Sequence, residues 1–166
     1  FPRMHLPFAV TLSTGFNWLF ELGVLIAAIW LFGGFPIPWI PLLLVFMVLL
    51  GLLATGIAML LAIVNVHFRD TQHFTAIVIS MWFYLTPVIY PISLVETAAA
   101  QRGDWILTVY RLNPMERFIA VFRNLLYDNT WPALDDSLVC FVWAIGAFLL
   151  GYVVFVNNEK RLAELL

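Results

Sequence analysis

The chain has 166 residues, of which 63% are hydrophobic and 11% are charged, and its mean hydropathy is +0.97. A soluble domain of this size cannot bury so much apolar surface in one core, so the composition excludes a water-soluble globular protein and predicts an integral membrane protein. The formal net charge of −2 points to neither nucleic acid nor an acidic surface as a partner. The single cysteine, Cys140, can form no disulfide within the chain and says nothing about its compartment.

Four apolar runs are long enough to be membrane-spanning helices, since about 20 apolar residues cross a hydrocarbon core roughly 30 Å thick. They are residues 6–32, 39–64, 74–95 and 137–156. Residues 33–38 are rich in Gly and Pro, which interrupt helices for opposite backbone reasons. We therefore predict an all-α integral membrane protein with four transmembrane helices, together with short re-entrant or interfacial helices.

The second run carries small residues at three- and four-residue steps: Gly51, Ala54, Ala58 and Ala62. This spacing places them on one stripe of a helix, where another helix can approach closely. Residues 51–56 do not form a nucleotide-binding loop, because Ile57 stands where such a loop needs lysine.

A polar turn, residues 66–73, precedes the third run. Its polar members include His67, Arg69, Asp70, Thr71 and His73. Asp70 or Thr71 can cap the helix that follows, and the turn can also serve as a docking elbow for a cytoplasmic partner protein. His67 and His73 are six residues apart, which does not place them on one helix face, so we predict neither a metal site nor a catalytic residue here.

The third run ends in aromatic residues and prolines. Its aromatic members there are Trp82, Phe83, Tyr84 and Tyr90, with prolines at 87 and 91. Such aromatics gather at membrane interfaces, and they can also line a passage in which their ring faces contact sugar rings. Both interpretations remain open at this stage.

Glu21 is the one ionisable residue well inside a predicted span. Ionisable groups are costly at this depth and usually face a polar interior or a partner. Glu21 therefore either bonds to Asn17 or a neighbouring helix, or lies on a transport path.

Residues 96–136 are mixed in character. Asn113, Pro114 and Glu116 form a helix-start pattern, with Asn113 as the cap and Glu116 completing a capping box. One face of this helix is apolar and carries Met115, Phe118, Ile119, Phe122, Leu125 and Leu126, and the other carries Glu116, Arg117, Arg123 and Asn124. It ends near Asp128, too short to cross a membrane, so we predict an interfacial or re-entrant helix. Residues 105–112 can pair with it.

Charge alone does not orient the chain. A cytoplasmic elbow puts four basic residues inside, Arg3, Arg69, Lys160 and Arg161, and four outside, Arg102, Arg111, Arg117 and Arg123. The inside four lie closer to the ends of the spans, where the positive-inside rule has most force, and this favours a cytoplasmic elbow.

Four short motifs occur in a fixed order along the chain. They are residues 68–70 (FRD), 86–91 (TPVIYP), 112–115 (LNPM) followed by Arg123, and 158–161 (NEKR). Together they resemble the carboxyl-terminal two-thirds of an ABC-2 type permease, most of all the branch that exports O-antigen, teichoic acid, capsule and related polysaccharides. Thr86 stands where many of those permeases have serine.

The resemblance implies a six-span fold, of which residues 1–166 lack the amino-terminal amphipathic helix and first two spans; the start at Phe1 instead of Met agrees with this expectation. It implies that the elbow, His67, Phe68, Arg69 and Asp70, is a coupling helix that touches an ATPase. It also implies that the third run lines the channel, with Phe74, Trp82, Phe83, Tyr84 and Tyr90 as its lining residues. The resemblance further implies that the next two short helices are gate helices, with Asn113, Pro114, Arg117 and Arg123 as their key residues.

We therefore predict the permease subunit of an ATP-driven exporter of lipid-linked polysaccharide in the inner (plasma) membrane of a bacterium. Its partners are a second copy of itself and two ATPase subunits, which bind ATP and Mg; the chain itself has no cofactor and is no enzyme. The cargo can be a cell-wall galactan. Two alternatives stay open: an ABC-2 permease for small lipophilic compounds, and a membrane enzyme acting on lipid-linked sugars through His67, Asp70 and Glu21.

Overall fold

The computed structural model describes residues 5–68, 70–103 and 105–164, and these contain helices and no strand. The α-helices are α1 (His5–Leu31), α2 (Ile40–His67), α3 (Thr71–Leu85), α4 (Ile92–Arg102), α5 (Trp105–Leu112), α6 (Pro114–Arg123) and α7 (Leu134–Glu164). A short 3-10 helix, η1 (Ile37–Trp39), precedes α2, and a π-helical turn, η2 (Asn124–Asp128), follows α6. The predicted all-α class is confirmed.

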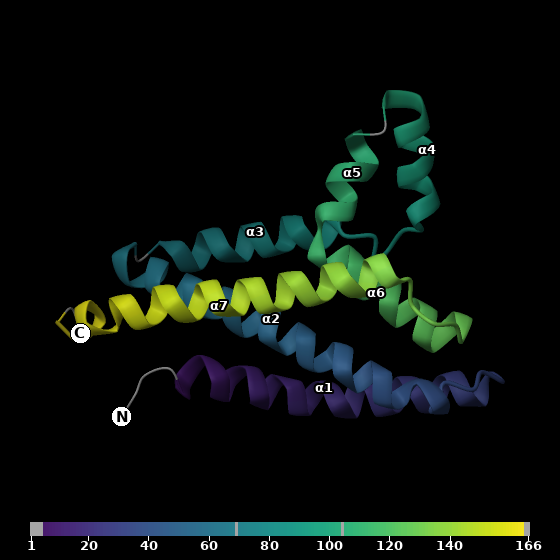
Figure 1. Ribbon diagram of the computed structural model, residues 1–166, viewed down its shortest axis with the longest axis horizontal. Helices are drawn as coiled ribbons and strands as arrows, with labels where there is room; N and C mark the ends of the chain where they lie inside the picture. The colour runs from purple at the N-terminus through teal and green to yellow at the C-terminus, as the bar shows by residue number, and fades with distance from the viewer. Residues whose placement is uncertain (1–4, 69, 104, 165–166) are drawn as a thin grey trace.

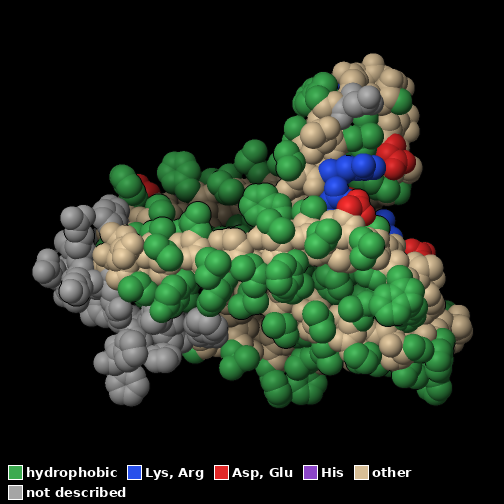
Figure 2. All heavy atoms as spheres, in the orientation of Figure 1, with side chains coloured by type: hydrophobic (Ala, Val, Ile, Leu, Met, Phe, Trp, Pro, Cys, Tyr) green, Lys and Arg blue, Asp and Glu red, His purple; other side chains and the backbone are tan. Residues whose placement is uncertain are grey.

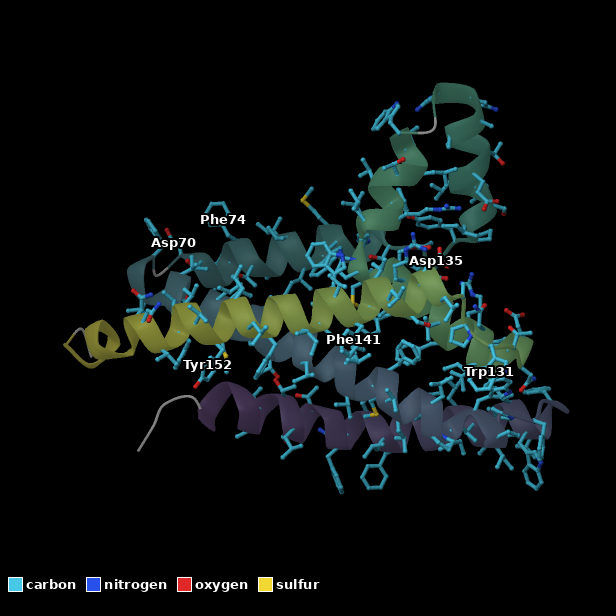
Figure 3. All side chains as sticks on the ribbon, viewed as in Figure 1. Asp70, Phe74, Trp131, Asp135, Phe141 and Tyr152 are labelled. Atoms are coloured by element: carbon cyan, nitrogen blue, oxygen red, sulfur yellow. The ribbon has the colours of Figure 1, made fainter. Side chains whose placement is uncertain are left out.

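The three longest helices, α1, α2 and α7, run along the length of the molecule, and α2 packs against both α1 and α7 (Figure 1). α3 lies alongside this bundle, and the hairpin formed by α4 and α5 stands across it. The start of α1, the turn before α3 and the end of α7 lie at one end of the bundle. Trp131 and Asp135 lie toward the other end (Figure 3). The chain therefore groups the predicted inside segments at one end.

Three described helices are long and apolar enough to cross a membrane: Ala9–Leu31, Ile37–Val66 and Leu134–Asn158. They correspond to three of the four predicted spans. The fourth predicted span, residues 74–95, is divided, because α3 ends at Leu85 and α4 begins at Ile92. With 15 residues, α3 is about 22 Å long at 1.5 Å per residue, which is shorter than the hydrocarbon core.

The turn between α1 and α2 depends on two glycines. Gly33 has a positive φ of 89°, which glycine adopts without the steric cost that other residues pay. This lets the Gly33 N–H donate to the Trp30 carbonyl and the Gly34 N–H to the Ile29 carbonyl, at 3.1 and 2.9 Å. Carbonyls at the end of α1 thus find partners, as is usual at helix ends, and the chain turns back into α2.

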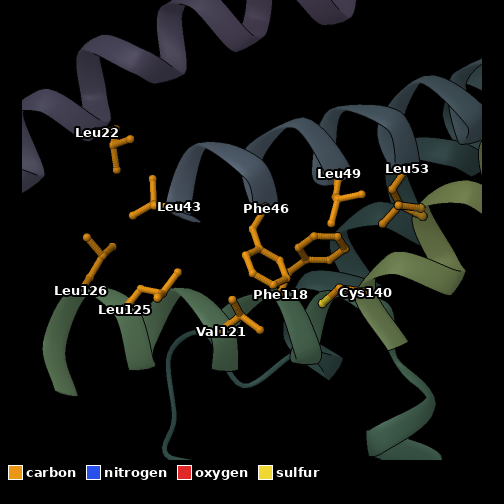
Figure 4. Packing of buried hydrophobic residues seen from close by; sticks show 11 residues of the cluster. Leu22, Leu43, Phe46, Leu49, Leu53, Phe118, Val121, Leu125, Leu126 and Cys140 are labelled. Atoms are coloured by element: carbon orange, nitrogen blue, oxygen red, sulfur yellow. The ribbon is translucent and has the colours of Figure 1, made fainter. Parts of the chain in front are cut away.

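The largest core cluster joins α2, α6, η2 and α7 (Figure 4). Leu43, Phe46 and Leu53 of α2 face Phe118 and Val121 of α6, and all five are at most 5% exposed. The same cluster includes Leu22 of α1 and Cys140 of α7. α6 is therefore packed onto the long helices by its predicted apolar face.

Backbones of α2 and α7 approach most closely at Gly56 and Gly151. A Cβ on either glycine would lie under 3.0 Å from backbone atoms of the other helix. The predicted small-residue stripe only partly marks this contact, since Ala54 is exposed and Gly51 faces Thr11 of α1. The difference arises because α2 packs against helices on more than one side, so a single stripe does not mark the closest approach.

We predict that Gly151→Ala destabilises the protein. The new methyl group meets backbone of α2, which cannot rotate away, and overpacking of this kind costs about 1–3 kcal/mol. Unfolding measured by denaturant titration in detergent should show a lower midpoint. Gly146→Ala is the control on the same helix, because a Cβ there meets no atom within 4 Å. Equal midpoints for the two variants would contradict the predicted backbone contact.

Candidate functional site

Asn113, the residue before α6, is the centre of a hydrogen-bond network that joins α3 to α6. Its side-chain oxygen accepts from the Met115 N–H at 3.0 Å and from the Trp82 indole at 2.8 Å. Its side-chain nitrogen donates to the Thr86 hydroxyl at 3.0 Å, and that hydroxyl donates to the Trp82 carbonyl at 2.8 Å. The predicted cap is confirmed, and the same side chain also holds the end of α3. We call Asn113, Trp82 and Thr86 the Asn113 network.

Pro114 occupies the predicted first position of α6 and is buried. The predicted capping box does not form, because the Asn113 N–H donates to the Tyr110 carbonyl at 3.0 Å. α5 ends one residue before Asn113, so its last turn takes the donor that a capping box needs.

Two prolines cause the break between α3 and α4. Pro87 has no N–H and disfavours helical backbone at the residue before it, and Thr86 is accordingly extended (φ −97°, ψ 134°). Pro91 is also extended, with φ −72° and ψ 146°, and precedes α4. Non-helical backbone needs polar partners at membrane depth. The Tyr90 hydroxyl supplies one by donating to the Tyr84 carbonyl at 3.1 Å.

Tyr110 of α5 holds the other side of this break. Its hydroxyl lies 2.5 Å from the Tyr90 hydroxyl. Since Tyr90 uses its one hydrogen on the Tyr84 carbonyl, Tyr110 is the donor in this pair. The break is thus bonded to α5 through Tyr110 and to α6 through Asn113.

Arg117 ties α5 and α6 to the start of α7. Its Nη1 bonds the Asp136 carboxylate and lies 3.7 Å from Asp135 Oδ2, and its Nε donates to the Arg111 carbonyl at 3.0 Å. Only 11% of the Arg117 side chain and 13% of the Asp136 side chain are exposed. Figure 2 shows charged side chains gathered where the α4–α5 hairpin meets the bundle, beside a long apolar face.

Glu116 is buried beside this ion pair, although the sequence places it on a polar outer face. It is 8% exposed, and its Oε2 lies 3.4 Å from Arg117 Nε but accepts no hydrogen bond from the described residues. Burial raises the pKa of its carboxyl, an effect that Arg117 opposes and Asp136 reinforces. The prediction of an outer polar face is wrong here because this face packs against the start of α7. Arg123, at the end of α6, is exposed as predicted.

A cavity of about 1050 Å³ opens between α2, α3, α5 and α7. Its lining is almost entirely apolar and includes Ile57 of α2, Trp82 and Leu85 of α3, Val109 of α5, and Trp143 and Leu150 of α7. Asn113 and Pro114 also line it. The Asn113 network is therefore a polar boundary of an apolar cavity.

The predicted channel-lining residues lie on different faces of α3. Trp82 is half-buried and lines the cavity, whereas Tyr84 is 68% exposed and lies about 200° away from Trp82 at 100° per residue. Phe83 makes an edge-to-face pair with Tyr84, with ring centroids 5.6 Å apart. Phe74, 67% exposed, points away from the bundle (Figure 3). One passage cannot contact all of them within a single copy of the chain.

The predicted elbow lies in the turn between α2 and α3. Phe68 is extended and 69% exposed, and Asp70 is exposed next to it; Arg69 and the His67 side chain lie outside the described residues. Asp70 occupies the cap position of α3, but its side chain makes no cap hydrogen bond. The Thr71 hydroxyl donates backward to the Phe68 carbonyl at 2.6 Å. The predicted side-chain cap is therefore wrong for Asp70, and the turn is held by Thr71.

Glu21 is exposed on α1, and no hydrogen bond or ion pair joins it to another described residue. The predicted bond to Asn17 is not formed. Among the described residues, no group of three or more His, Cys, Asp and Glu side chains could hold a metal ion.

Several residues of the site escaped prediction. Tyr110, Asp135 and Asp136 contact partners 18 to 20 residues away in the sequence, and no local pattern indicates such pairs. The cavity likewise needs four helices in their final positions. The sequence does show two acidic residues, Asp135 and Asp136, in the first turn of α7, where the positive end of a helix dipole favours them. That local reason does not indicate that they pair with Arg117.

Comparisons with known proteins cover the chain fully. A family model described as "ABC-2 type transporter" matches residues 4–127. The O-antigen export system permease protein RfbA of Myxococcus xanthus is 28% identical over 165 residues, which is 99% of this chain and 61% of that protein. The protein of the same name from Klebsiella pneumoniae is 26% identical over 172 residues, 100% of this chain and 61% of that protein. The chain thus spans about three-fifths of the length of these relatives, and no solved structure matches it significantly.

We predict that Asn113→Ala destabilises the protein by about 3 kcal/mol, from loss of a helix cap worth about 1 kcal/mol and of two side-chain hydrogen bonds, to Trp82 and Thr86, worth about 1 kcal/mol each. Denaturant titration in detergent measures the change. Thr86→Ser is the matched control, because it keeps the hydroxyl that Asn113 bonds. A double-mutant cycle of Asn113→Ala with Thr86→Val should show coupling of about 0.5 kcal/mol or more, and strictly additive effects would rule the network out.

We predict a comparable loss for Arg117→Gln, because it leaves the part-buried Asp136 carboxylate without its cation. Breaking a fully buried ion pair from one side costs about 3–5 kcal/mol, and the 13% exposure of the Asp136 side chain puts the expected loss near the lower end of that range. Arg123→Gln removes the same charge from the exposed end of α6 and should change the free energy of unfolding by about 0.5 kcal/mol or less. Both are compared in the same detergent titration, and similar losses would show that Arg117 holds no buried pair.

Proposed function

The chain belongs to the ABC-2 type transporter family, and on that premise we propose that it is the permease subunit of an ATP-driven exporter of lipid-linked cell-envelope polysaccharide. We place it in the plasma (inner) membrane of a bacterium, paired with a second copy and with two ATPase subunits that bind ATP and Mg. The chain itself supplies no nucleotide site in this proposal.

One observation carries the mechanism: α3 runs from the exposed turn at Phe68 and Asp70 to the Asn113 network. The turn lies at the same end of the bundle as the end of α7, and the network lies toward the opposite end. A force applied to the turn thus acts through α3 on the start of α6. No residue of α3 is fully buried, so this helix can shift with little loss of core packing.

In the proposed cycle, ATP closes the ATPase dimer, and the turn transmits that movement to α3. Trp82 and Thr86 pull on Asn113, and Tyr90 pulls on Tyr110. These bonds move α5 and α6, which act as gate helices at the outer face. The Arg117–Asp136 pair resists the movement, because it fixes α6 to α7.

Polysaccharide is the proposed cargo because both relatives are named as O-antigen export permeases. The exposed Phe83 and Tyr84 rings agree with this cargo, since aromatic faces suit sugar rings. A galactan is one such polymer. The second copy would supply the facing wall of the passage.

A permease for small lipophilic compounds is the second candidate. The apolar cavity of about 1050 Å³ favours it, because lipophilic ligands bind in apolar cavities of this size class. A membrane enzyme has less support. Glu21 is exposed on α1, whereas Asp70 lies in the turn at one end of the bundle, and His67 is described only in its backbone.

We predict that Phe68→Ala combined with Asp70→Lys uncouples the permease from its ATPase. The substitutions remove an exposed ring and reverse a charge in the turn, without touching a core residue. Co-purification of the full-length permease with its ATPase in mild detergent should lose the ATPase, and ATP-dependent export should fall at least about tenfold.

Phe35→Ala is the control, because Phe35 is also a well exposed ring (57%, against 69% for Phe68) and lies in the turn between α1 and α2, away from the elbow. If no ATPase associates with the wild-type protein under any nucleotide condition, the permease mechanism fails. Turnover of lipid-linked sugars without ATPase would then favour the enzyme.

A further inference from the structure

The cavity between α2, α3, α5 and α7 is apolar on nearly every side. Its lining includes polar side-chain groups on Trp82, Tyr110, Asn113 and Trp143. Three of these groups are already bonded, the Trp82 indole to Asn113 at 2.8 Å and the Tyr110 hydroxyl to Tyr90. A polar occupant would therefore lose its hydrogen bonds to water and find few in return, which is costly. A hydrocarbon chain has no hydrogen bonds to lose on entering, and its apolar surface matches the apolar lining.

Two of the walls are α2 and α7, which are long and apolar enough to span a membrane. The cavity therefore lies beside membrane-spanning helices. From these observations we propose that it holds the hydrocarbon chain of the lipid-linked cargo. The inference rests on the proposed function, because it assigns one part of that cargo to one place in the permease.

The two faces of α3 fit the two parts of such a cargo. Trp82 and Leu85 face the cavity, whereas Tyr84, about 200° from Trp82 round the helix, and Phe83 form an exposed aromatic pair. Sugar rings contact the exposed aromatic pair while the lipid chain stays on the cavity side. α3 thus separates the polymer from its lipid anchor.

One charged residue, Arg111, lies beside the cavity wall in the sequence of α5. It stands between Tyr110 and Leu112, which both line the cavity. Its side chain is exposed, and no salt bridge joins it to a described acidic residue, although its charge opposes the rise in the pKa of the Glu116 carboxyl. A phosphate that links the chain to the sugar would meet this guanidinium, and arginine is well suited to bind phosphate.

Gly146 gives a direct test, because it lines the cavity and a Cβ there meets no atom within 4 Å. Gly146→Phe fills the cavity without displacing the neighbouring backbone. Gly23→Phe is the matched control, since Gly23 lies within a spanning helix, its Cβ also meets nothing within 4 Å, and it does not line the cavity. Equal unfolding midpoints would show that both variants fold.

The experiment uses the full-length permease with its ATPase in lipid nanodiscs and a polyprenyl phosphate that carries a diazirine on its chain. Wild type should be labelled within Val142–Leu150 of α7. Gly146→Phe should lower that labelling and ATP-dependent export about tenfold, as expected when a few buried methylene groups are displaced. Gly23→Phe should match wild type, and Arg111→Gln should weaken labelling while Arg102→Gln does not.

Three results would overturn the inference. Labelling and export that Gly146→Phe leaves unchanged would show that the cavity is not used. A diazirine phospholipid that labels the same peptide as strongly, without competition from polyprenyl phosphate, would assign the cavity to bilayer lipid. If Gly146→Phe prevented the permease from forming a dimer but left the labelling unchanged, the cavity would be the binding site of the second copy. Failure of the proposed function looks different, because wild type itself then shows no ATP-dependent export.

Discussion

The hydrogen bonds of Asn113 are the interaction on which the functional half of the molecule depends. Pro87 ends α3 and leaves the chain without helical hydrogen bonding in a strongly apolar region. One amide side chain satisfies the Trp82 indole, the Thr86 hydroxyl and the first turn of α6 together. The break therefore becomes a defined joint between α3 and α6, and its geometry follows from satisfied polar groups.

Packing divides the chain into a firm part and a loosely held part. α2, α6 and α7 share the main core, and α2 and α7 meet through backbone contact at Gly56 and Gly151. α3 buries no residue fully and is held chiefly at its ends. Elements with few buried contacts open and shift most easily. This contrast suits a helix that carries motion along the bundle to the start of α6.

Charge is concentrated where α5 and α6 meet the start of α7. Arg117 joins residues of α5, α6 and α7 in one buried cluster, and such a cluster is costly to leave half-paired. Glu116 has one buried oxygen that accepts no hydrogen bond from the described residues, so the cluster is not fully satisfied. The proposed movement of α6 relative to α7 would cost no hydrogen bond at this oxygen, while the Arg117–Asp136 pair resists it.

The membrane class, three long spans, the cap at Asn113 and the end of the helix formed by α6 and η2 at Asp128 follow from the sequence alone, because apolar run length, proline chemistry and cap preference act within a few residues. The family resemblance also came from short motifs in order. Three features became visible only in the folded protein: Glu116 is buried, Trp82 and Tyr84 lie on opposite faces of α3, and Arg117 pairs with Asp136. Each of these depends on which helix covers a given face. That choice is made by contacts between residues far apart in the chain, which no local pattern records.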